Sequence, residues 1–322
     1  MNKNTRIFLA VFAISLPFWV GINVVEKDLS DMIFLNQLAR TPESFTAQAL
    51  QEQIFEARPI LKTVREDIAI QGKGVISVFG DKTGKVKVLY AQNITDRLPI
   101  ASLTKLMTAL IATKHYNLEQ EIAITPYIIA EEGTSGLLQS GDIFTVQELL
   151  SPLLIESSND AAAALASLVG ETAFVNLMNL EASELGLSNT FFINPTGLDP
   201  NNETSPFNYS SAKDLAFLMQ HLLNTYPEVA RILRIQEADL YTKQGAFHHT
   251  MVNTNELLGY ANWPTQILGG KTGWTPLAKE SLALVLEGPK DKGYIVHVVL
   301  GSSDRFGETK RLADWVFNSF KW

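Results

Sequence analysis

The chain has 322 residues, 46% of them hydrophobic, and a formal net charge of −8 at pH 7. This length supports one large or two small domains with a substantial core, and the mildly acidic balance argues against nucleic acid as a partner. The sequence contains no cysteine, which excludes disulfides, thiol catalysis and thiolate metal sites.

The N-terminus carries an apolar run over residues 7–25, preceded by Lys3 and Arg6. The run reaches the ~20 residues that span hydrocarbon and is long for the apolar part of a signal peptide. Positive charge ahead of it favours a cytoplasmic N-terminus. We therefore predict that residues 1–25 form a signal anchor, a single transmembrane helix that places the rest of the chain on the extracytoplasmic side of the cell membrane. A cleaved signal peptide would also export the protein, to the periplasm or the medium.

Residues 26–65 are rich in Glu, Gln, Ala and Leu and are predicted to form a juxtamembrane spacer. One folded domain is expected over residues 66–322. It starts with two strand-like runs, 75–79 and 86–90, joined by Lys82-Thr-Gly84. A glycine-bearing stretch between two such runs predicts a hairpin turn.

The next element is a helix over residues 101–113, where Leu, Met and Ala dominate and Pro99 suits the entry. Positions i and i+3 share one face of a helix, so Ser102 and Lys105 are expected side by side. A serine hydroxyl becomes a useful nucleophile only beside a base. Lysine can act as that base when its pKa falls below the usual ~10.4, which burial and a second cation such as Lys271 would both promote.

A mostly helical middle follows, up to about residue 235, with an Ala-rich buried helix at 161–168. The last third returns to strands at 271–275, 281–286 and 294–300, and the chain closes with an amphipathic helix at 309–320. Strands at both ends of a helical middle predict a sheet that is completed late and flanked by helices.

Three short strings occur in a fixed order: Ser102-Leu-Thr-Lys105, Ser157-Ser-Asn159 and Lys271-Thr-Gly273. Singly they are weak signals, because the chain has a second S-x-x-K at 210–213 and a second K-T-G at 82–84. We interpret the former as a helix start, with Ser211 and Asp214 as a capping box, and the latter as the hairpin turn. The ordered triple indicates an active-site-serine acyl-transfer enzyme acting on peptides or β-lactams.

The chain resembles the low-molecular-mass penicillin-binding proteins, specifically the serine D-alanyl-D-alanine carboxypeptidases, over roughly residues 66–322. The resemblance implies an α/β fold of the β-lactamase/transpeptidase type, with an antiparallel sheet flanked by helices and an all-helical subdomain. It rests on the three strings and on further stretches, among them Leu98-Pro-Ile-Ala, Thr145-Val-Gln-Glu-Leu-Leu150, Asn194-Pro-Thr-Gly-Leu-Asp199 and Asn253-Thr-Asn-Glu-Leu-Leu258.

The resemblance also implies roles for the matching positions. Ser102 would be the acylated nucleophile and Lys105 the base that activates it. Ser157 and Asn159 would relay protons and orient the substrate amide. No cofactor and no metal are implied.

The substrate-binding positions implied by the resemblance are Lys271, Thr272, Gly273 and Trp274. Lys271 and Thr272 would grip the terminal carboxylate, and the backbone N–H groups of Ser102 and Trp274 would form the oxyanion hole. The chain departs from the family where Ala278-Lys279 replaces a frequent Ala-Gly pair, and where Trp274 replaces the His of some members. These departures bear on deacylation and on the pocket rim.

The expected function is removal of the terminal D-Ala from peptidoglycan stem peptides, with β-lactams as inhibitors. Two alternatives use the same fold: a D,D-endopeptidase, and a serine β-lactamase. Class A β-lactamases commonly carry an E-x-x-L-N loop, which residues 160–270 lack; the nearest string is Glu184-Leu-Gly-Leu-Ser188. An alternative of another class is a non-catalytic, membrane-tethered wall-binding protein.

Other polar residues point to structure more than to chemistry. The five histidines lack metal-ligand spacing, and the neighbours His248 and His249 are expected to point in opposite directions on an extended segment. Asn253 and Asn255 either line a cleft or satisfy loop backbone. The string Asn194-Pro-Thr-Gly is expected to form a structural turn.

Overall fold

The structure is a computed structural model that describes residues 59–63, 67–130, 137–202 and 204–322. The predicted signal anchor and nearly all of the predicted spacer lie outside these residues. The chain divides into two units, Met1–Leu61 with Lys321–Trp322, and Lys62–Phe320. The described part of the first unit includes strand β1 (Ile60–Leu61), and the chain ends in β13 (Phe320–Lys321). The second unit, Lys62–Phe320, holds the other described helices and strands.

The centre of this unit is a five-stranded antiparallel sheet with the order β10-β11-β12-β2-β3. The early strands β2 and β3 join the late strands through the pair β12–β2, so the prediction of a sheet completed late is confirmed. Residues 82–84 turn between β2 and β3, and Gly84 has a φ of 88° that favours glycine. The strands are β2 (Gly74–Asp81), β3 (Val86–Gln92), β10 (Ile267–Thr275), β11 (Lys279–Glu287) and β12 (Gly293–Ser302).

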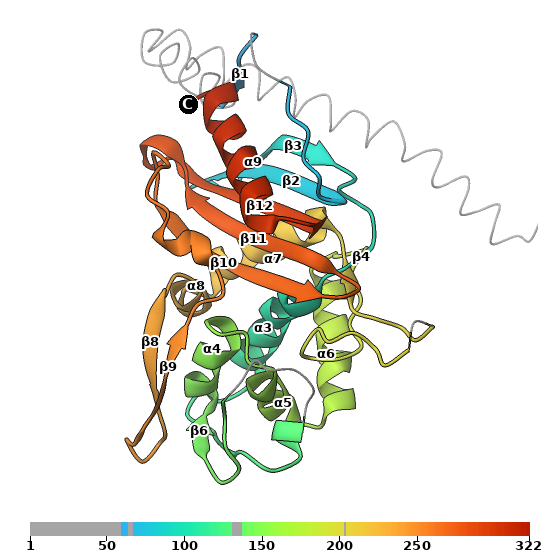
Figure 1. Cartoon of the computed structure of the whole chain (residues 1–322), viewed down its shortest axis with the longest axis vertical. Helices are drawn as coiled ribbons and strands as arrows, with labels where there is room; N and C mark the ends of the chain where they lie inside the picture. The colour runs from blue at the N-terminus through green and yellow to red at the C-terminus, as the bar shows by residue number, and fades with distance from the viewer. Residues whose placement is uncertain (1–58, 64–66, 131–136, 203) are drawn as a thin grey trace, which may run out of the picture. The chain divides into compact units, whose positions relative to one another are not determined.

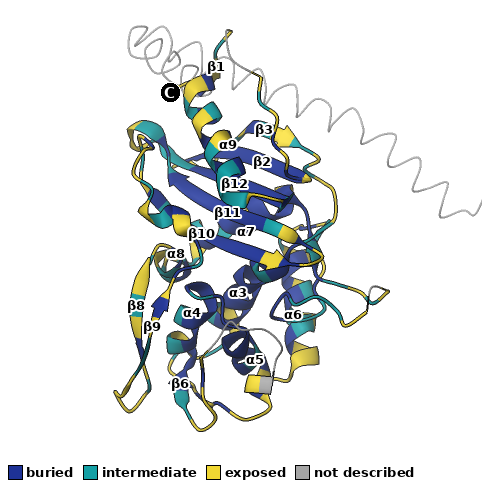
Figure 2. Cartoon of the chain, in the orientation of Figure 1, coloured by how far each residue is buried: buried dark blue, intermediate teal, exposed yellow. Residues whose placement is uncertain are grey.

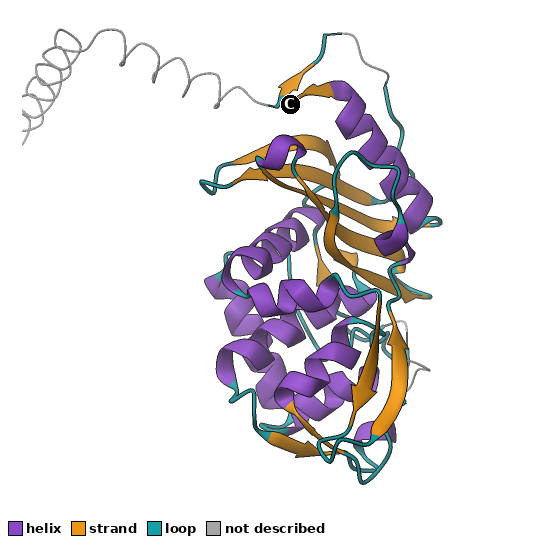
Figure 3. Cartoon of the chain, turned by 90° about the vertical axis from the view of Figure 1, so that its left-hand side faces the viewer, coloured by secondary structure: helices purple, strands orange, loops and turns teal. Residues whose placement is uncertain are grey.

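Helices cover both faces of this sheet (Figures 1 and 3). Helix α9 (Arg305–Ser319) packs on one face, while α7 (Ala212–Thr225) and α8 (Pro227–Leu233) lie on the other. Alternation along the strands makes this possible, since Ile76, Val78 and Val296 enter the core on the α7 side. The result is the antiparallel sheet flanked by helices that the resemblance implied.

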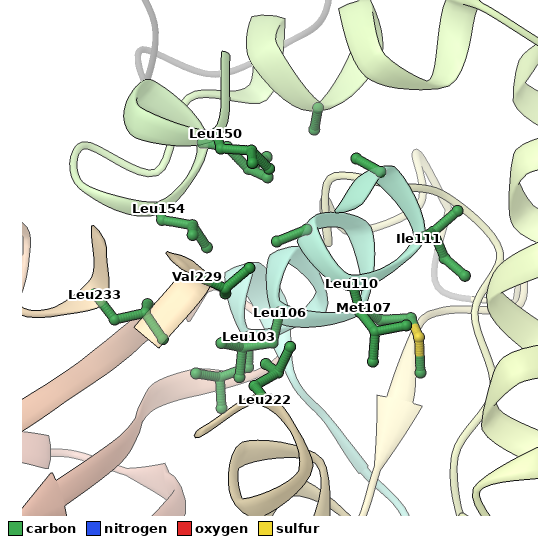
Figure 4. Packing of buried hydrophobic residues seen from close by; sticks show 14 of the residues in the cluster. Leu103, Leu106, Met107, Leu110, Ile111, Leu150, Leu154, Leu222, Val229 and Leu233 are labelled. Carbon is green, nitrogen blue, oxygen red and sulfur yellow. The ribbon is translucent and has the colours of Figure 1, made fainter. Parts of the chain in front are cut away.

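Helix α3 (Lys105–His115) is the centre of the helical region and follows directly on the 3₁₀ turn η1 (Ala101–Thr104). Every residue from Lys105 to Ala112 is buried, as expected for a helix surrounded by other elements. Figure 4 shows its leucines packed against Leu150, Leu222 and Val229. The surrounding elements include η2 (Ile128–Ala130), α4 (Val146–Leu154), α5 (Asn159–Ser167) and α6 (Glu171–Glu184).

The region around α3 was expected to be an all-helical subdomain, and this expectation is wrong because the region also contains short strands. It carries three two-stranded pieces, and the hairpin β8–β9 projects beside α4 (Figure 1). The hairpin has a weak sequence signal because it is largely exposed and buries only Leu240 and Met251 (Figure 2). The remaining elements are β4 (Leu98–Pro99), β5 (Glu121–Ala123), β6 (Ile143–Thr145), β7 (Tyr209–Ser210), β8 (Glu237–Tyr241), β9 (Phe247–Val252), η3 (Glu256–Gly259) and η4 (Pro289–Asp291).

The second S-x-x-K string lies where α7 begins, as predicted. The Ser211 side chain accepts a hydrogen bond from Asp214 N and caps the helix. The predicted capping box is wrong, however, because the Asp214 carboxylate accepts from Asn189 N and Thr190 Oγ1 instead. Tertiary contacts therefore redirect the second half of a local motif.

Within the described part of the chain, no single helix combines the length and the apolar composition needed to cross a bilayer. Helices α5 and α6 meet these criteria only as a pair bent by 97°.

His297 on β12 predicts acid sensitivity of the fold. Its ring has no exposed surface, and burial lowers its pKa to about 3 from ~6.5 in the unfolded chain. Between these values the unfolded chain binds the extra proton, so stability is complete above pH ~6.5 and declines as the pH falls, by up to about 5 kcal/mol. Urea unfolding of the wild type and His297→Leu at pH 7.5 and 4.5 should show a shallower pH dependence in the variant. Equal slopes would show that His297 does not contribute.

Candidate active site

Ser102 and Lys105 are brought together by the turn that opens α3. The sequence predicted one α-helix here, but its first turn is the 3₁₀ turn η1, in which side chains at i and i+3 lie directly above one another. Lys105 Nζ lies 3.0 Å from Ser102 Oγ. The preceding Ala101 has a φ of 47°, an unusual value for a residue with a side chain.

The contacts of Lys105 determine how its amine can act. Its Nζ also donates to Asn159 Oδ1 at 2.7 Å and to the Thr196 carbonyl at 2.8 Å. Both oxygens can only accept, so a neutral amine gives them its two hydrogens. The remaining lone pair then faces the Ser102 hydroxyl, which becomes the donor. The site is therefore built to take a proton from Ser102.

The protonation of both lysines is shifted by their surroundings. Lys105 has no exposed surface; burial lowers its pKa well below the ordinary lysine value, and the nearby charge of Lys271 lowers the pKa further. Burial also lowers the pKa of Lys271 to about 7, with a smaller contribution from Arg305. Burial and the neighbouring positive charge of Lys271 both favour the neutral form of Lys105.

Ser157 lies in the turn between α4 and α5, and Asn159 is the first residue of α5. Ser158 caps α5 by accepting from Ala161 N, which places Asn159 at the first helical position, beside Lys105. Ser157 has a φ of 65°, a conformation that costs on the order of 1–3 kcal/mol and needs support from its neighbours. Its hydroxyl accepts a hydrogen bond from Lys271 Nζ at 2.8 Å.

Strand β10 carries residues 271–274 past the nucleophile. A Cβ on Gly273 would lie 2.8 Å from Ile100 O and 3.2 Å from Ser102 N, so only glycine allows the strand to approach η1 this closely. Lys271 and Thr272 are buried, whereas Trp274 is 59% exposed.

Several residues of the site were not predicted from the sequence. Thr254 Oγ1 contacts Thr272 Oγ1 at 2.5 Å, and Arg305 Nη1 donates to Gly273 O at 3.1 Å. Thr196 was assigned only to a structural turn, yet its carbonyl binds Lys105. The string Asn194-Pro-Thr-Gly was the sequence feature that could have pointed to Thr196. Its predicted turn is confirmed by the hydrogen bond that Gly197 N donates to Asn194 Oδ1.

Asn253 and Asn255 satisfy loop backbone, which resolves the alternative left open by the sequence. Asn253 Nδ2 donates to Ile235 O, and Asn255 Oδ1 accepts from Leu257 N. Both side chains are buried. They hold the segment that presents Thr254 to β10.

The fold and this site together define a transpeptidase-like protein in which a buried lysine lies beside a half-buried serine. The family described as D-alanyl-D-alanine carboxypeptidase (peptidase S11) matches residues 62–304. The chain therefore belongs to this family, and the resemblance seen in the sequence is confirmed.

Individual relatives agree with this assignment. D-alanyl-D-alanine carboxypeptidase DacF of Bacillus subtilis is 32% identical over 265 residues, covering 79% of this chain and 64% of the relative. A D-alanyl-D-alanine endopeptidase of Escherichia coli is 30% identical over 238 residues, covering 71% of this chain and 73% of the relative. The solved S216A mutant of the Streptomyces K15 DD-transpeptidase matches with a TM-score of 0.68 and 27% identity, over 78% of this chain and 100% of that chain.

The chain is shorter than several of these relatives. It spans 64% of the length of DacF and 59% of that of DacC from Escherichia coli.

Proposed function

We propose that this protein is a serine D-alanyl-D-alanine carboxypeptidase that removes the terminal D-Ala from peptidoglycan stem peptides. The observation that carries the proposal is the coordination of Lys105. Its buried amine is held by two acceptors, Asn159 Oδ1 and Thr196 O, so that its third position meets Ser102 Oγ at 3.0 Å. A lysine with a purely structural role would require neither a lowered pKa nor a serine hydroxyl beside its amine, whereas a general base requires both.

The reaction follows from these contacts. Ser102 Oγ attacks the carbonyl carbon of the penultimate D-Ala while its proton passes to Lys105 Nζ. The tetrahedral intermediate collapses when the amide bond breaks and the leaving amine takes a proton, directly from Lys105 or through the Ser157 hydroxyl. Free D-Ala departs, and water then hydrolyses the ester on Ser102. Backbone N–H groups of Ser102 and Trp274 would bind the developing oxyanion.

The substrate carboxylate is proposed to bind beside β10. Lys271 supplies positive charge beneath the strand, and its contact with Ser157 Oγ links the carboxylate region to the proton relay. Thr272 and Gly273 present the strand edge to the substrate, and the exposed Trp274 ring lies at the rim. No cofactor is required by this chemistry.

The test is release of D-Ala from a small peptide ending in D-Ala-D-Ala by the full-length protein, together with labelling by a fluorescent penicillin. D-Ala release and a long-lived penicillin adduct are expected. Binding of the peptide without D-Ala release, and without an adduct, would instead support the non-catalytic wall-binding alternative.

A D,D-endopeptidase is the second candidate, because relatives with this name match most of their own length. The endopeptidase of Pseudomonas aeruginosa is 32% identical, with 76% of its length covered. Cleavage of cross-linked muropeptide dimers, measured beside D-Ala release, separates the two activities. A β-lactamase is less well supported, since Glu184 binds Lys114 at the end of α6. Rapid penicillin turnover would favour it.

The membrane assignment is part of the proposal. Residues 1–25 are proposed as a single-pass anchor, residues 26–65 as the spacer and residues 66–322 as the catalytic domain on the extracytoplasmic side. The apolar run with Lys3 and Arg6 ahead of it supports this orientation. Fractionation of the full chain, with protease protection of its N-terminus, tests it.

Lys271 predicts how substrate capture depends on pH. Because its pKa is about 7, the free enzyme loses this charge as the pH rises through 7, and kcat/KM for the anionic peptide should decline. Lys271→Gln is expected to lower kcat/KM by about tenfold to hundredfold, mostly through KM, and to remove this decline. A C-terminally amidated peptide is the control, because its hydrolysis should respond less to the substitution. An equal loss with both peptides would contradict carboxylate recognition.

A further inference from the structure

The neighbouring histidines of β9 do not diverge, contrary to the sequence prediction. Leu240 pairs with His249 and Tyr241 pairs with Phe247, so His248 is an extra residue in the ladder. Such a bulge interrupts the alternation of side chains. Both rings consequently meet, with His248 Nδ1 only 2.6 Å from His249 Nδ1.

Each ring also contacts a carboxylate through its other nitrogen. His248 Nε2 lies 3.0 Å from Asp142 Oδ2, and His249 Nε2 lies 2.8 Å from Glu156 Oε2. The four side chains thus form a continuous row, Asp142–His248–His249–Glu156, which we call the histidine row. It joins the segment before β6, the hairpin β8–β9 and the turn after α4.

The histidine row needs a definite number of protons. Each of its three contacts joins two atoms that carry lone pairs, so each requires one hydrogen between them. Two neutral imidazoles supply only two N–H groups. A third hydrogen on the rings completes the row and leaves one positive charge between two carboxylates.

The half-buried carboxylate of Glu156 gives an independent reason for this charge. Its Oε1 atom is buried and has no hydrogen-bond partner among the described residues, so His249 is the contact that compensates the carboxylate. A carboxylate with one oxygen out of reach of water is stabilised when a hydrogen-bonded cation faces its other oxygen.

The row ends next to the strained residue of the site. Glu156 directly precedes Ser157, whose φ of 65° must be maintained by its surroundings. Thr254 N, just beyond β9, donates to Ile155 O at 3.1 Å, and Thr254 Oγ1 contacts Thr272. The hairpin and the segment leading into Ser157 are therefore joined at Glu156 and, through Thr254, at Ile155.

Other charged groups nearby are already engaged. Lys243 pairs with Glu121 at 2.5 Å, Asp239 accepts from a threonine hydroxyl at 2.7 Å, and Glu148 accepts from the N-cap of α4. The Tyr241 ring packs on its neighbour across the hairpin, and Glu237 lies at the far end of β8. Asp142 and Glu156 are thus the described ionisable groups in direct contact with the two rings.

We propose that His248 and His249 together hold one proton beyond their neutral forms, and that the resulting charge positions the Ser157 turn for acylation of Ser102. The histidines are positioning residues, since they act through Glu156 and touch no substrate. The role of the turn in acylation rests on the proposed function.

Nitrogen-15 NMR of the full-length protein, labelled at histidine, counts the ring hydrogens directly. Three N–H groups on the pair are expected, with one signal shifted far downfield by the short N–H···N contact. Glu156→Gln retains an acceptor but removes the negative charge that faces His249, so under the same conditions the variant should show fewer ring N–H groups on the pair than the wild type. Two ring N–H groups throughout the pH range would overturn the proposal, whatever the enzyme activity.

Acylation kinetics test the positioning role. His249→Gln should slow acylation by fluorescent penicillin on the order of tenfold to hundredfold, with little change in the initial binding constant. Faster hydrogen exchange is expected at Ser157 and its neighbours. His115→Gln, an exposed histidine at the end of α3, is the matched control and should behave as the wild type.

The outcomes separate the two proposals. A wild type that penicillin does not acylate refutes the proposed function, while the NMR count still tests the shared proton. Unchanged acylation and unchanged exchange in both His249→Gln and Glu156→Gln would overturn the positioning role. If His249→Gln does not fold, Glu156→Gln still tests the positioning role, provided that its unfolding midpoint matches that of the wild type.

Discussion

Ser102→Ala is expected to abolish labelling by fluorescent penicillin and to lower D-Ala release by on the order of 10⁴-fold or more. The hydroxyl is the atom that Lys105 faces at 3.0 Å, and no covalent adduct forms without it. Gel fluorescence and a D-Ala assay on the same protein samples measure both effects. The substitution removes one oxygen from a half-buried position, so the unfolding midpoint should change little.

The chain provides a matched control in its second S-x-x-K string. Ser210 is buried and its Oγ contacts Thr190 Oγ1 at 2.7 Å, whereas Lys213 is exposed on α7. Ser210→Ala should therefore keep the penicillin adduct. If labelling is retained in Ser102→Ala, or is lost only in Ser210→Ala, then Ser102 is not the nucleophile.

Lys105→Met is expected to slow acylation by about 10²- to 10⁴-fold, the usual contribution of a general base. Methionine matches the apolar stem of lysine but cannot take the proton of Ser102. Stopped-flow penicillin binding, which separates complex formation from acylation, should place the loss in the acylation step. Lys213→Met is the control and should acylate normally.

The same substitution should change the pH profile. Burial and the charge of Lys271 lower the pKa of Lys105, so the reactive neutral amine is lost as the pH falls below that lowered pKa. The wild-type acylation rate should therefore decline on the acid side, and Lys105→Met should lack this decline. An acid limb of unchanged position in the variant would mean that another group is the base.

The secondary structure around the site was largely predictable because its signals are local. The hairpin turn at 82–84, the Ala-rich helix α5 and the three late strands all occur where the sequence predicted them. Each depends on residue type and spacing within about ten positions. The hairpin β8–β9 was missed because its side chains are mostly exposed and its alternation is broken at His248.

The site shows where local reasoning stops. Two S-x-x-K strings are equivalent as text, yet only the first has its lysine buried beside acceptors from α5 and from the 194–197 turn. These acceptors lie 54 and 91 positions away along the chain. No local propensity specifies such a contact, since it is produced by packing of α3 against both elements.

The sequence by itself determined the ordered set Ser102, Lys105, Ser157 and Lys271, and with it the family, because i and i+3 positions must meet in any helical turn. Only the tertiary structure decided which amine is desolvated, which acceptors hold its hydrogens, and that two histidines meet at a bulge. Proton affinities and hydrogen-bond partners depend on distance and burial in space, and neither quantity is encoded by spacing along the chain.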